Sequence, residues 1–562
     1  MIRLTAFAAA ALICAACSPE DVADARDDAA ASSGLPTVSA VTESDIAARI
    51  AHLADDSFEG RAPGTDAGEA AAQWIADEMA RVGLKPAVDG SFFQQVEMVA
   101  QTVKPGASGF SVSVGDEVRT LAPGEDIVFW TKRQTEDPIA FDGSDVVFVG
   151  YGVVAPEYGW DDYAGLDAAG KTVVMLVNDP GFATEDPDLF KGRAMTYYGR
   201  WTYKFEEAAR QGATSALVIH ETEPASYPWA VIGSDPFGER ADLVRNDAGE
   251  SRIPIEGWLS AGAAEAMFAA AGLDFGEMKE AAKTPGFTPV PMSGVKASAR
   301  LEQSVTRAKS RNVAGMVEGA QAPDEFIIYT AHWDHLGQSL NFATDDAINN
   351  GAVDNATGTS MVLEIAEALA AGEAPARSVL FLAVTLEESG LLGSAYFAEN
   401  PFVPLNKIVA GINIDAYGPI GRTRDMKVVG SGASELEDIL ADILAEAGRV
   451  TSPDPRPEAG LFYRSDHVSL AKKGVPMMYA DAGMDKLDGG VEAGLAEDAD
   501  YYANRYHKPS DEYDDSWDVS GMAEDAEVLL ELGRRIALSP DWPTWYSGHE
   551  FEAVRQASLN QE

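Results

Sequence analysis

The chain has 562 residues, of which 46% are hydrophobic and 23% are charged, so it is long enough for two or more globular domains. Its 42 basic and 90 acidic residues give a formal net charge of -48. This balance excludes binding of nucleic acid or anionic lipid through clustered Lys and Arg, because both polyanions are repelled. The acidity favours solubility and does not identify a substrate.

The first 17 residues resemble an export signal. Arg3 precedes an apolar run over residues 4–16, which is too short to cross a bilayer as a permanent helix of about 20 residues. The A-A-C-S stretch resembles a bacterial lipoprotein processing site that would leave Cys17 lipidated, although Cys14 replaces the usual Leu. Ordinary cleavage nearby is the alternative. We expect a periplasmic or cell-envelope lipoprotein attached to the membrane only through Cys17, or else a secreted protein.

The segment after this signal changes from a tether to ordered structure. Residues 18–40 are rich in Ala, Asp, Ser and Pro and have no apolar period, which predicts a flexible tether. Thr42 then offers a cap for a helix with apolar residues at helical spacing, and a second helix is expected over residues 67–82, before Gly83. We assign residues 41–135 to the first part of the main domain.

A different pattern extends over residues 136–295. Short apolar runs that predict buried strands lie at 146–149, 173–177 and 216–219, and a helix is expected at 204–211. The phrases G-Y-G-V, D-D-Y-A-G-L-D-A-A-G-K-T-V-V and A-A-R-Q-G-A-T resemble the β-rich protease-associated domain inserted in many exopeptidases. Its one histidine, His220, ends a strand and is read as structural. We therefore expect this insert to cover or shape a cleft.

After Arg311, apolar strands and amphipathic helices alternate. Strands are expected at residues 326–330, 379–385, 408–414 and 475–480, and helices at 357–370, 391–398 and 436–447. This alternation predicts an α/β fold with a mostly parallel, doubly wound sheet flanked by helices, over residues 296–540. The Gly- and Asp-rich stretch at 481–504 is expected to be a loop, either a mobile lid or an ordinary surface segment. Residues 541–562 form a C-terminal tail.

Side chains that bind metals follow three of these strands. His332, Glu388 and Asp415 each come just after the end of an expected strand. Because the carboxyl ends of parallel strands meet at one sheet edge, these side chains should lie together. Asp354 precedes a helix in the stretch G-A-V-D-N-A-T-G, and His507 lies in a late loop.

These five residues have the composition of a two-zinc site. Imidazole and carboxylate hold zinc with few protein ligands, which leaves a position for water. Two ions about 3.5–4 Å apart that share one carboxylate need roughly five side chains. Only 7 histidines occur in the chain, yet 4 of them lie in these segments. Each residue alone would be interpreted as structural, but together they predict a metal site.

The segment from 311 to 514, together with F-E-G-R-A-P-G-T at residues 58–65, resembles the two-zinc exopeptidase family. That family includes bacterial leucyl aminopeptidases, glutamate carboxypeptidase and the glutaminyl cyclases. The resemblance implies that His332 and Asp415 bind one zinc ion. Glu388 and His507 would bind the second ion, and Asp354 would bridge the two. The metal is itself implied by the family, since this ligand set could also hold Co or Mn.

The same resemblance gives roles to residues beside the ligands. Asp334 falls where a carboxylate orients the first histidine. Glu387 falls on the general-base position, where it adjoins a ligand and is free to take a proton from water. The family also has a cis peptide after the bridging aspartate, which predicts one between Asp354 and Asn355. The substrates would be peptides whose free α-amino group binds on the metal side of the pocket.

The stretch F-Y-R-S-D-H at residues 462–467 resembles the family's substrate-pocket segment. Tyr463 is the candidate donor to the oxyanion, although Phe462 could occupy the same register. The residues assigned to the substrate pocket are Arg464, Asp466 and His467. Bracing of the loop is the alternative role for Arg464 and His467, and an arginine there would suit a substrate carboxylate.

The leading interpretation is an exported zinc aminopeptidase acting on peptides, with its oligomeric state left open. A carboxypeptidase, a dipeptidase or a glutaminyl cyclase of the same fold is the alternative. The intact set of five ligands disfavours a one-zinc cyclase, and Arg464 is the one obvious partner for a terminal carboxylate. A non-catalytic, receptor-like relative would have lost ligands, whereas all five and Glu387 are present.

Overall fold

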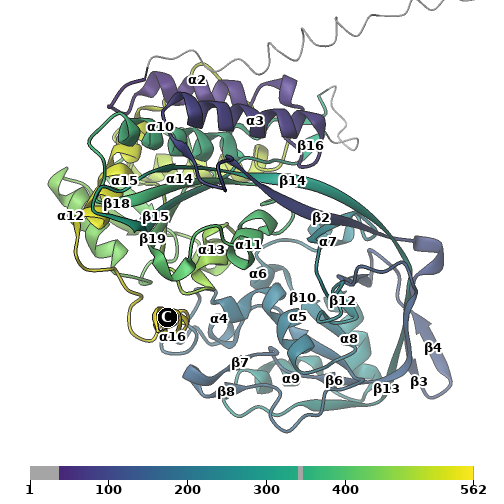
Figure 1. The fold of residues 1–562 in the computed structure, drawn as a ribbon. Helices are drawn as coiled ribbons and strands as arrows, with labels where there is room; N and C mark the ends of the chain where they lie inside the picture. Colours follow the sequence, from purple (N-terminus) through teal and green to yellow (C-terminus); the bar gives the residue numbers. More distant parts are fainter. Residues whose placement is uncertain (1–36, 339–345, 561–562) are drawn as a thin grey trace, which may run out of the picture.

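The computed structural model describes residues 37–338 and 346–560. Two sheets organise these residues, one of ten strands and one of eight (Figure 1). The predictions for the signal segment, most of the tether and the lipidation of Cys17 lie outside the described residues. Within the described ranges, no helix combines the length and the apolar character needed to cross a membrane.

The centre of the larger sheet is parallel. Its central strands, in spatial order, are β18 (Arg377–Val384), β15 (Ala322–His332), β19 (Ile408–Asn413) and β22 (Met477–Ala482). All four form parallel pairs with their central neighbours, as their apolar runs predict. The α/β fold class is therefore confirmed.

The edges of this sheet make it mixed rather than mostly parallel. The strands on one side are β14 (Gln303–Val317), β2 (Phe93–Val103), β11 (Arg240–Leu243) and the short β1 (Lys85–Pro86), all antiparallel to their neighbours. On the other side, β20 (Asp425–Val428) is antiparallel to β22 and parallel to β21 (Val450–Pro453). The apolar alternation after residue 311 does not reveal these edges, because they come mostly from other parts of the chain.

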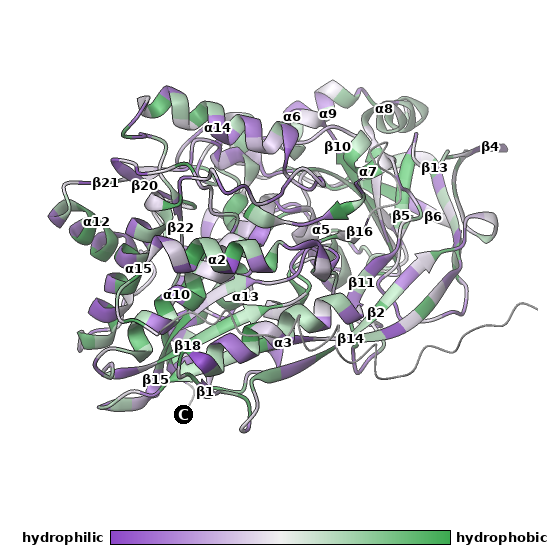
Figure 2. Cartoon of the chain, turned by 90° about the horizontal axis from the view of Figure 1, so that it is seen from above, coloured by the Kyte–Doolittle hydropathy of each residue, from purple (hydrophilic) through white to green (hydrophobic). Residues whose placement is uncertain are grey.

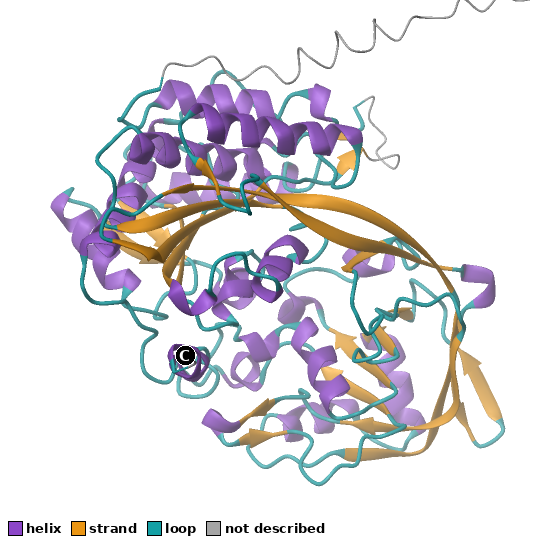
Figure 3. Ribbon diagram, in the orientation of Figure 1, coloured by secondary structure: helices purple, strands orange, loops and turns teal. Residues whose placement is uncertain are grey.

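Helices cover both faces of the larger sheet (Figure 3). One face carries α2 (Glu43–Leu53), α3 (Asp66–Arg81), α10 (Gly358–Ala370) and α15 (Ser520–Leu538), with α12 (Leu436–Glu446) packed against α15. The other face carries α11 (Leu392–Glu399) and α13 (His467–Ala471). Successive side chains of a strand point to opposite faces of the sheet. Ile327 of β15 therefore packs into the hydrophobic core on one face, and Ile328 into the core on the other. Figure 2 shows the matching alternation of hydrophobic and hydrophilic segments along the covering helices.

The N-terminal helix is fixed by a cap and by buried charges. The Thr42 hydroxyl oxygen accepts a hydrogen bond from the Asp45 N–H at 3.1 Å, as the capping signal predicts. Arg49 of α2 forms buried ion pairs with Glu364 and Glu367 of α10. These pairs hold the first ordered helix against the helix that follows Asp354.

The smaller sheet takes its strands from residues 109–301. Its strands are β3 (Gly109–Val114), β4 (Glu117–Thr120), β5 (Ile127–Trp130), β6 (Ile139–Phe148), β9 (Thr172–Leu176), β10 (Ser215–His220), β12 (Ile255–Ser260) and β13 (Val290–Leu301). Its helices include α5 (Trp201–Arg210), α8 (Ala261–Ala270) and α9 (Phe275–Ala282). Since β3, β4 and β5 belong to it, this sheet begins before residue 136. Its assignment as a protease-associated domain stays a prediction.

One antiparallel ribbon joins the two sheets. β2 pairs with β14 along its whole length, and Val103 lies directly opposite Gln303. Between the end of β2 and the start of β14 the chain builds the smaller sheet, and only β11 returns to pair with β2 in the larger one. Figure 1 shows the two long strands running from the larger sheet toward the smaller one.

The stretch at 481–504 is not the loop that its Gly and Asp content suggested. It contains α14 (Gly490–Asn504), which buries Gly494 and Tyr501 against the main domain. The helix forms because E-A-G-L-A-E-D-A-D-Y-Y supplies apolar side chains for packing, and packing overrides weak intrinsic propensity.

Candidate metal centre

Three neighbouring strands end level with one another. His332, the last residue of β15, lies opposite Val384, the last residue of β18. Thr330 lies opposite Asn413, where β19 ends. The residues that follow β18 and β19 therefore emerge beside His332, which is the arrangement that the sequence predicts.

The first half of the cluster is built on His332. Its Nε2 atom lies 3.0 Å from Asp415 Oδ1 and 3.1 Å from Asp354 Oδ1. All three residues are buried. They form one of the groups of donor atoms that lie close enough together to share a metal ion.

The second half is built on Glu388. His507 Nε2 lies 3.2 Å from Glu388 Oε2 and 3.3 Å from Asp354 Oδ2. Asp354 thus directs one carboxylate oxygen to each half, and the five expected ligands meet. His335 joins them, with Nδ1 lying 2.6 Å from Glu388 Oε1. His335 is one of the four histidines in the segments that carry the predicted ligands, and sequence analysis gives it no role.

The donor set fits two divalent cations. Asp354, Glu388 and Asp415 place three carboxylates in one small, largely buried volume. Like charges this close repel one another strongly unless cations compensate them. Imidazole and carboxylate together are the ligands that zinc prefers in sites that keep a position for water.

Arg61 of the F-E-G-R-A-P-G-T motif connects the loops that carry the ligands. Its buried guanidinium donates from Nε to the carbonyl of Trp333 at 2.8 Å and from Nη2 to that of Gly351 at 2.8 Å. Nη1 donates to the carbonyls of Leu53 at 2.6 Å and Asn350 at 2.5 Å. Burial lowers the pKa of Arg61 to about 10. The motif was visible in the sequence, but its partners were not.

Two further side chains hold individual ligands. Asp511 accepts the N–H groups of Val353 at 3.0 Å and of Asp354 at 3.1 Å. Ser465 donates its hydroxyl to Asp415 Oδ2 at 2.5 Å. Hydrogen bonds of this kind fix the orientation of a metal ligand. Ser465 lies in the F-Y-R-S-D-H stretch and Asp511 four residues after His507, and neither was assigned this role from sequence.

The cis peptide expected between Asp354 and Asn355 is present. The Asn355 side chain donates to the carbonyl of Ile414 at 3.0 Å and accepts from the N–H of Ala416 at 3.1 Å. The loop that carries Asp354 is thereby attached to both neighbours of Asp415. Gly351 begins this turn with φ of 56°, and a Cβ there would lie 2.5 Å from His335 Cγ. Only glycine can adopt this positive φ and also lie this close to His335 without strain.

Asp334 contacts the expected histidine differently from the prediction. His332 Nδ1 lies 3.0 Å from the backbone carbonyl of Asp334, whereas the carboxylate lies 3.9 Å away. The carboxylate instead accepts the Glu387 N–H at 3.2 Å. Burial, together with the charge of Glu388, raises the pKa of Glu387 well above its usual range. Asp334 therefore supports both the histidine and the backbone of the candidate base.

The residues of the 462–467 stretch differ in their surroundings, and their roles in substrate binding stay predictions. Tyr463 lines the second of the two cavities described below, and its hydroxyl donates to Glu550 Oε1 in the C-terminal segment at 2.5 Å. Asp466 and His467 are buried, and they line neither of the two cavities described below. Burial lowers the pKa of His467 to about 3, and the ring packs edge-on against Phe462. Arg464 does line a cavity.

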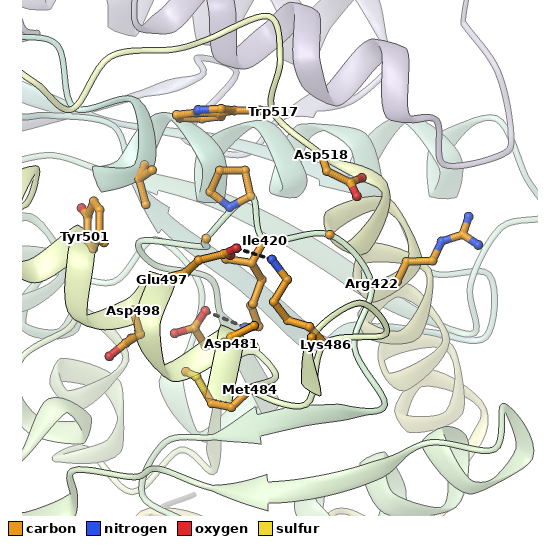
Figure 4. A pocket seen from close by; sticks show the side chains of 18 of the residues that line it. Ile420, Arg422, Asp481, Met484, Lys486, Glu497, Asp498, Tyr501, Trp517 and Asp518 are labelled. Carbon is orange, nitrogen blue, oxygen red and sulfur yellow. Dashed lines mark hydrogen bonds and ion pairs between the residues drawn. The ribbon is translucent and has the colours of Figure 1, made fainter. Parts of the chain in front are cut away.

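Two cavities adjoin the cluster on different sides. The first, of about 1010 Å³, lies beneath α14 and is lined by Val353 and Ala416, the neighbours of Asp354 and Asp415. Figure 4 shows its mixed wall, in which Ile420, Met484 and Trp517 lie near charged side chains. Two ion pairs lie in this wall, Lys486 with Glu497 and Lys427 with Asp481. This cavity can hold an apolar or amphipathic group next to the cluster.

The second cavity, also of about 1010 Å³, lies between the two domains. Glu387 and Glu388 line it from the main domain, together with Arg464. Arg200 and Trp258 line it from the insert. The candidate base therefore faces the cleft between the domains, and the insert forms the opposite wall, as the sequence predicts for it.

Comparison with known proteins agrees with this arrangement. Residues 312–532 match the profile of peptidase family M28. The mouse (Mus musculus) aminopeptidase NAALADL1 is 32% identical over 139 residues, which are 23% of this chain and 17% of that protein. A Caenorhabditis elegans glutamate carboxypeptidase 2 homolog is 31% identical over 138 residues, or 23% of this chain and 16% of that protein. The chain thus aligns with less than a fifth of the length of either relative.

Two solved structures align with most of the chain at low sequence identity. An aminopeptidase from Aneurinibacillus sp. strain AM-1 aligns with 90% of this chain and 95% of its own, at 16% identity and a TM-score of 0.49. The Bacillus subtilis zinc aminopeptidase BSAP aligns with 92% of this chain and 100% of its own, at 16% identity and a TM-score of 0.41. All five predicted ligands lie within residues 312–532, the region that matches the profile of peptidase family M28.

Proposed function

We propose that this protein is a zinc-dependent exopeptidase that removes N-terminal residues from peptides. The observation that carries the proposal is the position of Asp354, whose two carboxylate oxygens face His332 and His507. A carboxylate shared in this way is the feature that makes a two-ion site. His332 and Asp415 would hold one ion, and Glu388 and His507 the other.

When bound, the zinc ions would lower the pKa of a water molecule and polarise the scissile carbonyl. The Glu387 carboxylate, half-buried beside Glu388 and open to the interdomain cavity, takes the proton of the attacking water and passes it to the leaving amine. Asp334 fixes the backbone of Glu387 during this transfer. The cavity beneath α14 receives the part of the substrate on the amino side of the bond. The Tyr463 hydroxyl donates its hydrogen bond to Glu550 in the C-terminal segment. This proposal therefore assigns no oxyanion role to Tyr463.

The test is release of p-nitroaniline from a panel of aminoacyl-p-nitroanilides. We expect hydrolysis by zinc-loaded protein, loss on chelation and recovery when zinc is returned. Glu387→Gln should lower kcat by about 10²- to 10⁴-fold while two equivalents of zinc stay bound. Glu399→Gln is the matched control, since this acid lines the same cavity and its side chain is 47% exposed.

Two results would contradict the proposal. Full activity of the Glu387→Gln protein would remove that residue as the base. No release from any member of the panel by protein that binds two equivalents of zinc would favour a dipeptidase or carboxypeptidase of the same fold. We further propose export to the cell envelope through the N-terminal segment, which metabolic labelling of Cys17 with palmitate and its loss in Cys17→Ser would test.

A further inference from the structure

Tyr197 of the insert reaches across the boundary between the two domains. It begins the short turn Tyr197–Gly199, which precedes α5. Its half-buried side chain packs against the hydrophobic core of the insert and also against the core on the face of the larger sheet that carries α11 and α13. One side chain that is shared by two cores fixes the position of one domain relative to the other.

Three side chains of the main domain contact the Tyr197 ring, and we call them the socket: Tyr463, Lys472 and Phe551. The centroid of the Tyr197 ring lies 6.3 Å from that of Tyr463 and 6.4 Å from that of Phe551, which is within the range of favourable aromatic pairs. The Lys472 ammonium lies over the Tyr197 ring, 4.4 Å from its centroid. Phe551 belongs to the C-terminal segment, so the end of the chain completes the socket.

Glu206 of α5 joins the two sides of this contact. The Tyr197 hydroxyl donates a hydrogen bond to Glu206 Oε2, and Lys472 Nζ lies 3.2 Å from Glu206 Oε1. The carboxylate thereby connects a tyrosine of the insert to a lysine of the main domain. An ion pair between partly exposed side chains contributes little by itself, so the Tyr197 ring supplies most of the attachment.

The backbone on either side of the socket also approaches the insert closely. The Met195 N–H donates to the carbonyl of Pro457 at 3.1 Å, and the Ser226 hydroxyl donates to the carbonyl of Glu458 at 3.3 Å. Gly460 has φ of 63°, and a Cβ there would lie 2.6 Å from Met195 Sδ. Glycine at this position lets the main-domain loop lie against the insert. The contact around Tyr197 is therefore an interface formed by two complete segments.

The socket borders the catalytic cleft. Tyr463 and Lys472 line the interdomain cavity, as does the candidate base Glu387. Two residues after Tyr463, Ser465 donates its hydroxyl to the ligand Asp415. The contact that places the insert thus adjoins both the candidate base and the loop that orients one metal ligand.

We propose that Tyr197 is a positioning residue: docked in the socket, it holds the wall of the insert at the distance from Glu387 that substrate binding requires. The β2–β14 ribbon attaches the insert on one side, and Figure 1 shows α16 (Glu552–Leu559), which follows Phe551, on the other side. Domains joined by a small contact move relative to each other unless a second contact prevents it. The inference rests on the proposed function and deepens it by naming a residue that shapes the substrate cleft.

The docked state determines the apparent affinity for substrate. A ligand that needs both walls of the cleft binds only the docked molecules, so its apparent affinity falls in proportion to their fraction. Loss of a half-buried aromatic ring is enough to change a two-state equilibrium by about tenfold or more. Substrates that extend along the leaving side should be affected most, because their distant residues reach the wall that the insert supplies.

The experiment uses zinc-loaded protein and two substrates with the same first residue, a tetrapeptide that ends in three alanines and an aminoacyl-p-nitroanilide. For Tyr197→Ala we expect KM for the tetrapeptide to rise about tenfold while kcat stays within about threefold. KM for the shorter p-nitroanilide should change by less than about threefold. Tyr197→Phe should keep most of the affinity, because the ring remains.

The matched control is Tyr198→Ala, which removes the neighbouring ring. Tyr198 contacts the rings of Phe190 and Tyr203, and its hydroxyl donates to Glu157 Oε1 at 2.6 Å, all within the insert. This variant should leave KM for both substrates unchanged. The zinc content should stay at two equivalents in every variant, since no metal ligand is altered.

Double electron–electron resonance measures docking without catalysis. Spin labels on the exposed positions Val118→Cys of the insert and Leu538→Cys of the main domain report the distance between the domains, in a chain whose two natural cysteines are replaced by serine. We expect a narrow distance distribution that becomes broader in Tyr197→Ala but not in Tyr198→Ala. This result supports docking even if no peptide is cleaved, so failure of the proposed function remains distinguishable. Lys472→Met removes a contact from the socket side and should give a smaller change of the same kind, which covers the case that Tyr197→Ala does not fold.

Three results overturn the proposal. The first is an unchanged distance distribution in both Tyr197→Ala and Lys472→Met. The second is an equal change in Tyr198→Ala, which would assign the effect to the insert alone. The third is a broader distribution in active protein whose KM for the tetrapeptide is unchanged.

Discussion

Replacement of Arg61 by methionine tests whether one buried side chain holds the metal centre together. Arg61 donates to four backbone carbonyls, including those of Trp333 and Gly351, which lie next to the loops of His332 and Asp354. Methionine has a similar length but no donors. The substitution therefore leaves four buried acceptors without partners and detaches the N-terminal motif from both ligand loops.

The expected magnitude follows from these contacts. Hydrogen bonds to a charged donor contribute about 1.5–3 kcal/mol each. Burial of the guanidinium opposes this gain, since a pKa of about 10 in place of 12.5 corresponds to about 3 kcal/mol against the charged form. The four bonds outweigh this penalty, so we expect Arg61→Met to lower the free energy of unfolding by at least about 3 kcal/mol. Misplaced ligand loops should also weaken zinc binding by about 10- to 100-fold.

Chemical denaturation of the metal-free protein measures the first effect, and competition with a chromogenic chelator measures the second. Arg61→Lys should be intermediate, because an ammonium group has three donors for four carbonyls. Arg119→Met is the control, since its ion pair with Asp126 is exposed and should be worth at most about 1 kcal/mol. Unfolding and zinc affinity of Arg61→Met that match those of Arg119→Met would refute the reasoning.

Three further predictions concern single side chains. Tyr463→Phe should keep kcat/KM on p-nitroanilides within about threefold and lower stability by about 1 kcal/mol through loss of the Glu550 contact; a 100-fold fall in activity would restore its oxyanion role. His335→Gln should weaken one of two zinc equivalents by about tenfold in chelator competition, since His335 abuts Glu388; uniform or absent weakening contradicts this. Burial lowers the pKa of His549 to about 3, so the unfolded chain binds the extra proton below pH 6.5 and stability falls with pH down to about 3. His549→Phe keeps the stack on Trp545 and should reduce the slope of stability against pH by up to about 1.4 kcal/mol per unit; an unchanged slope would show that this histidine does not titrate on unfolding.

The parts of this molecule that could be predicted from sequence are those encoded locally. Apolar runs identified the parallel strands, and the residues after them identified the ligands, because a strand end is fixed by its own sequence. Arg61 lies in the F-E-G-R-A-P-G-T motif, but its partner Trp333 is 272 residues away in the sequence. Asp511 lies shortly after His507, and its partner Val353 is 158 residues away. No local pattern encodes such contacts.

Contacts between distant segments also explain two features that the local sequence does not reveal. Tyr463 was assigned to the oxyanion by its position near the S-D-H phrase, but Glu550 in the tail determines where its hydroxyl points. The composition of 481–504 suggested a loop, and burial of Tyr501 stabilises a helix instead.

The pairing of Val103 with Gln303 makes the insert an exchangeable cassette. Residues on adjacent antiparallel strands lie only about 5 Å apart, so a two-residue turn could replace the nearly two hundred residues between them. A longer, shorter or different insert could join the chain at this junction with little cost in loop-closure entropy. The strand ends that carry the ligands would stay where they are, because they do not depend on that junction. Each exchange would replace the wall of the cleft that the insert supplies. The same catalytic centre could then act on other substrates, while its ligand-bearing loops stay unchanged.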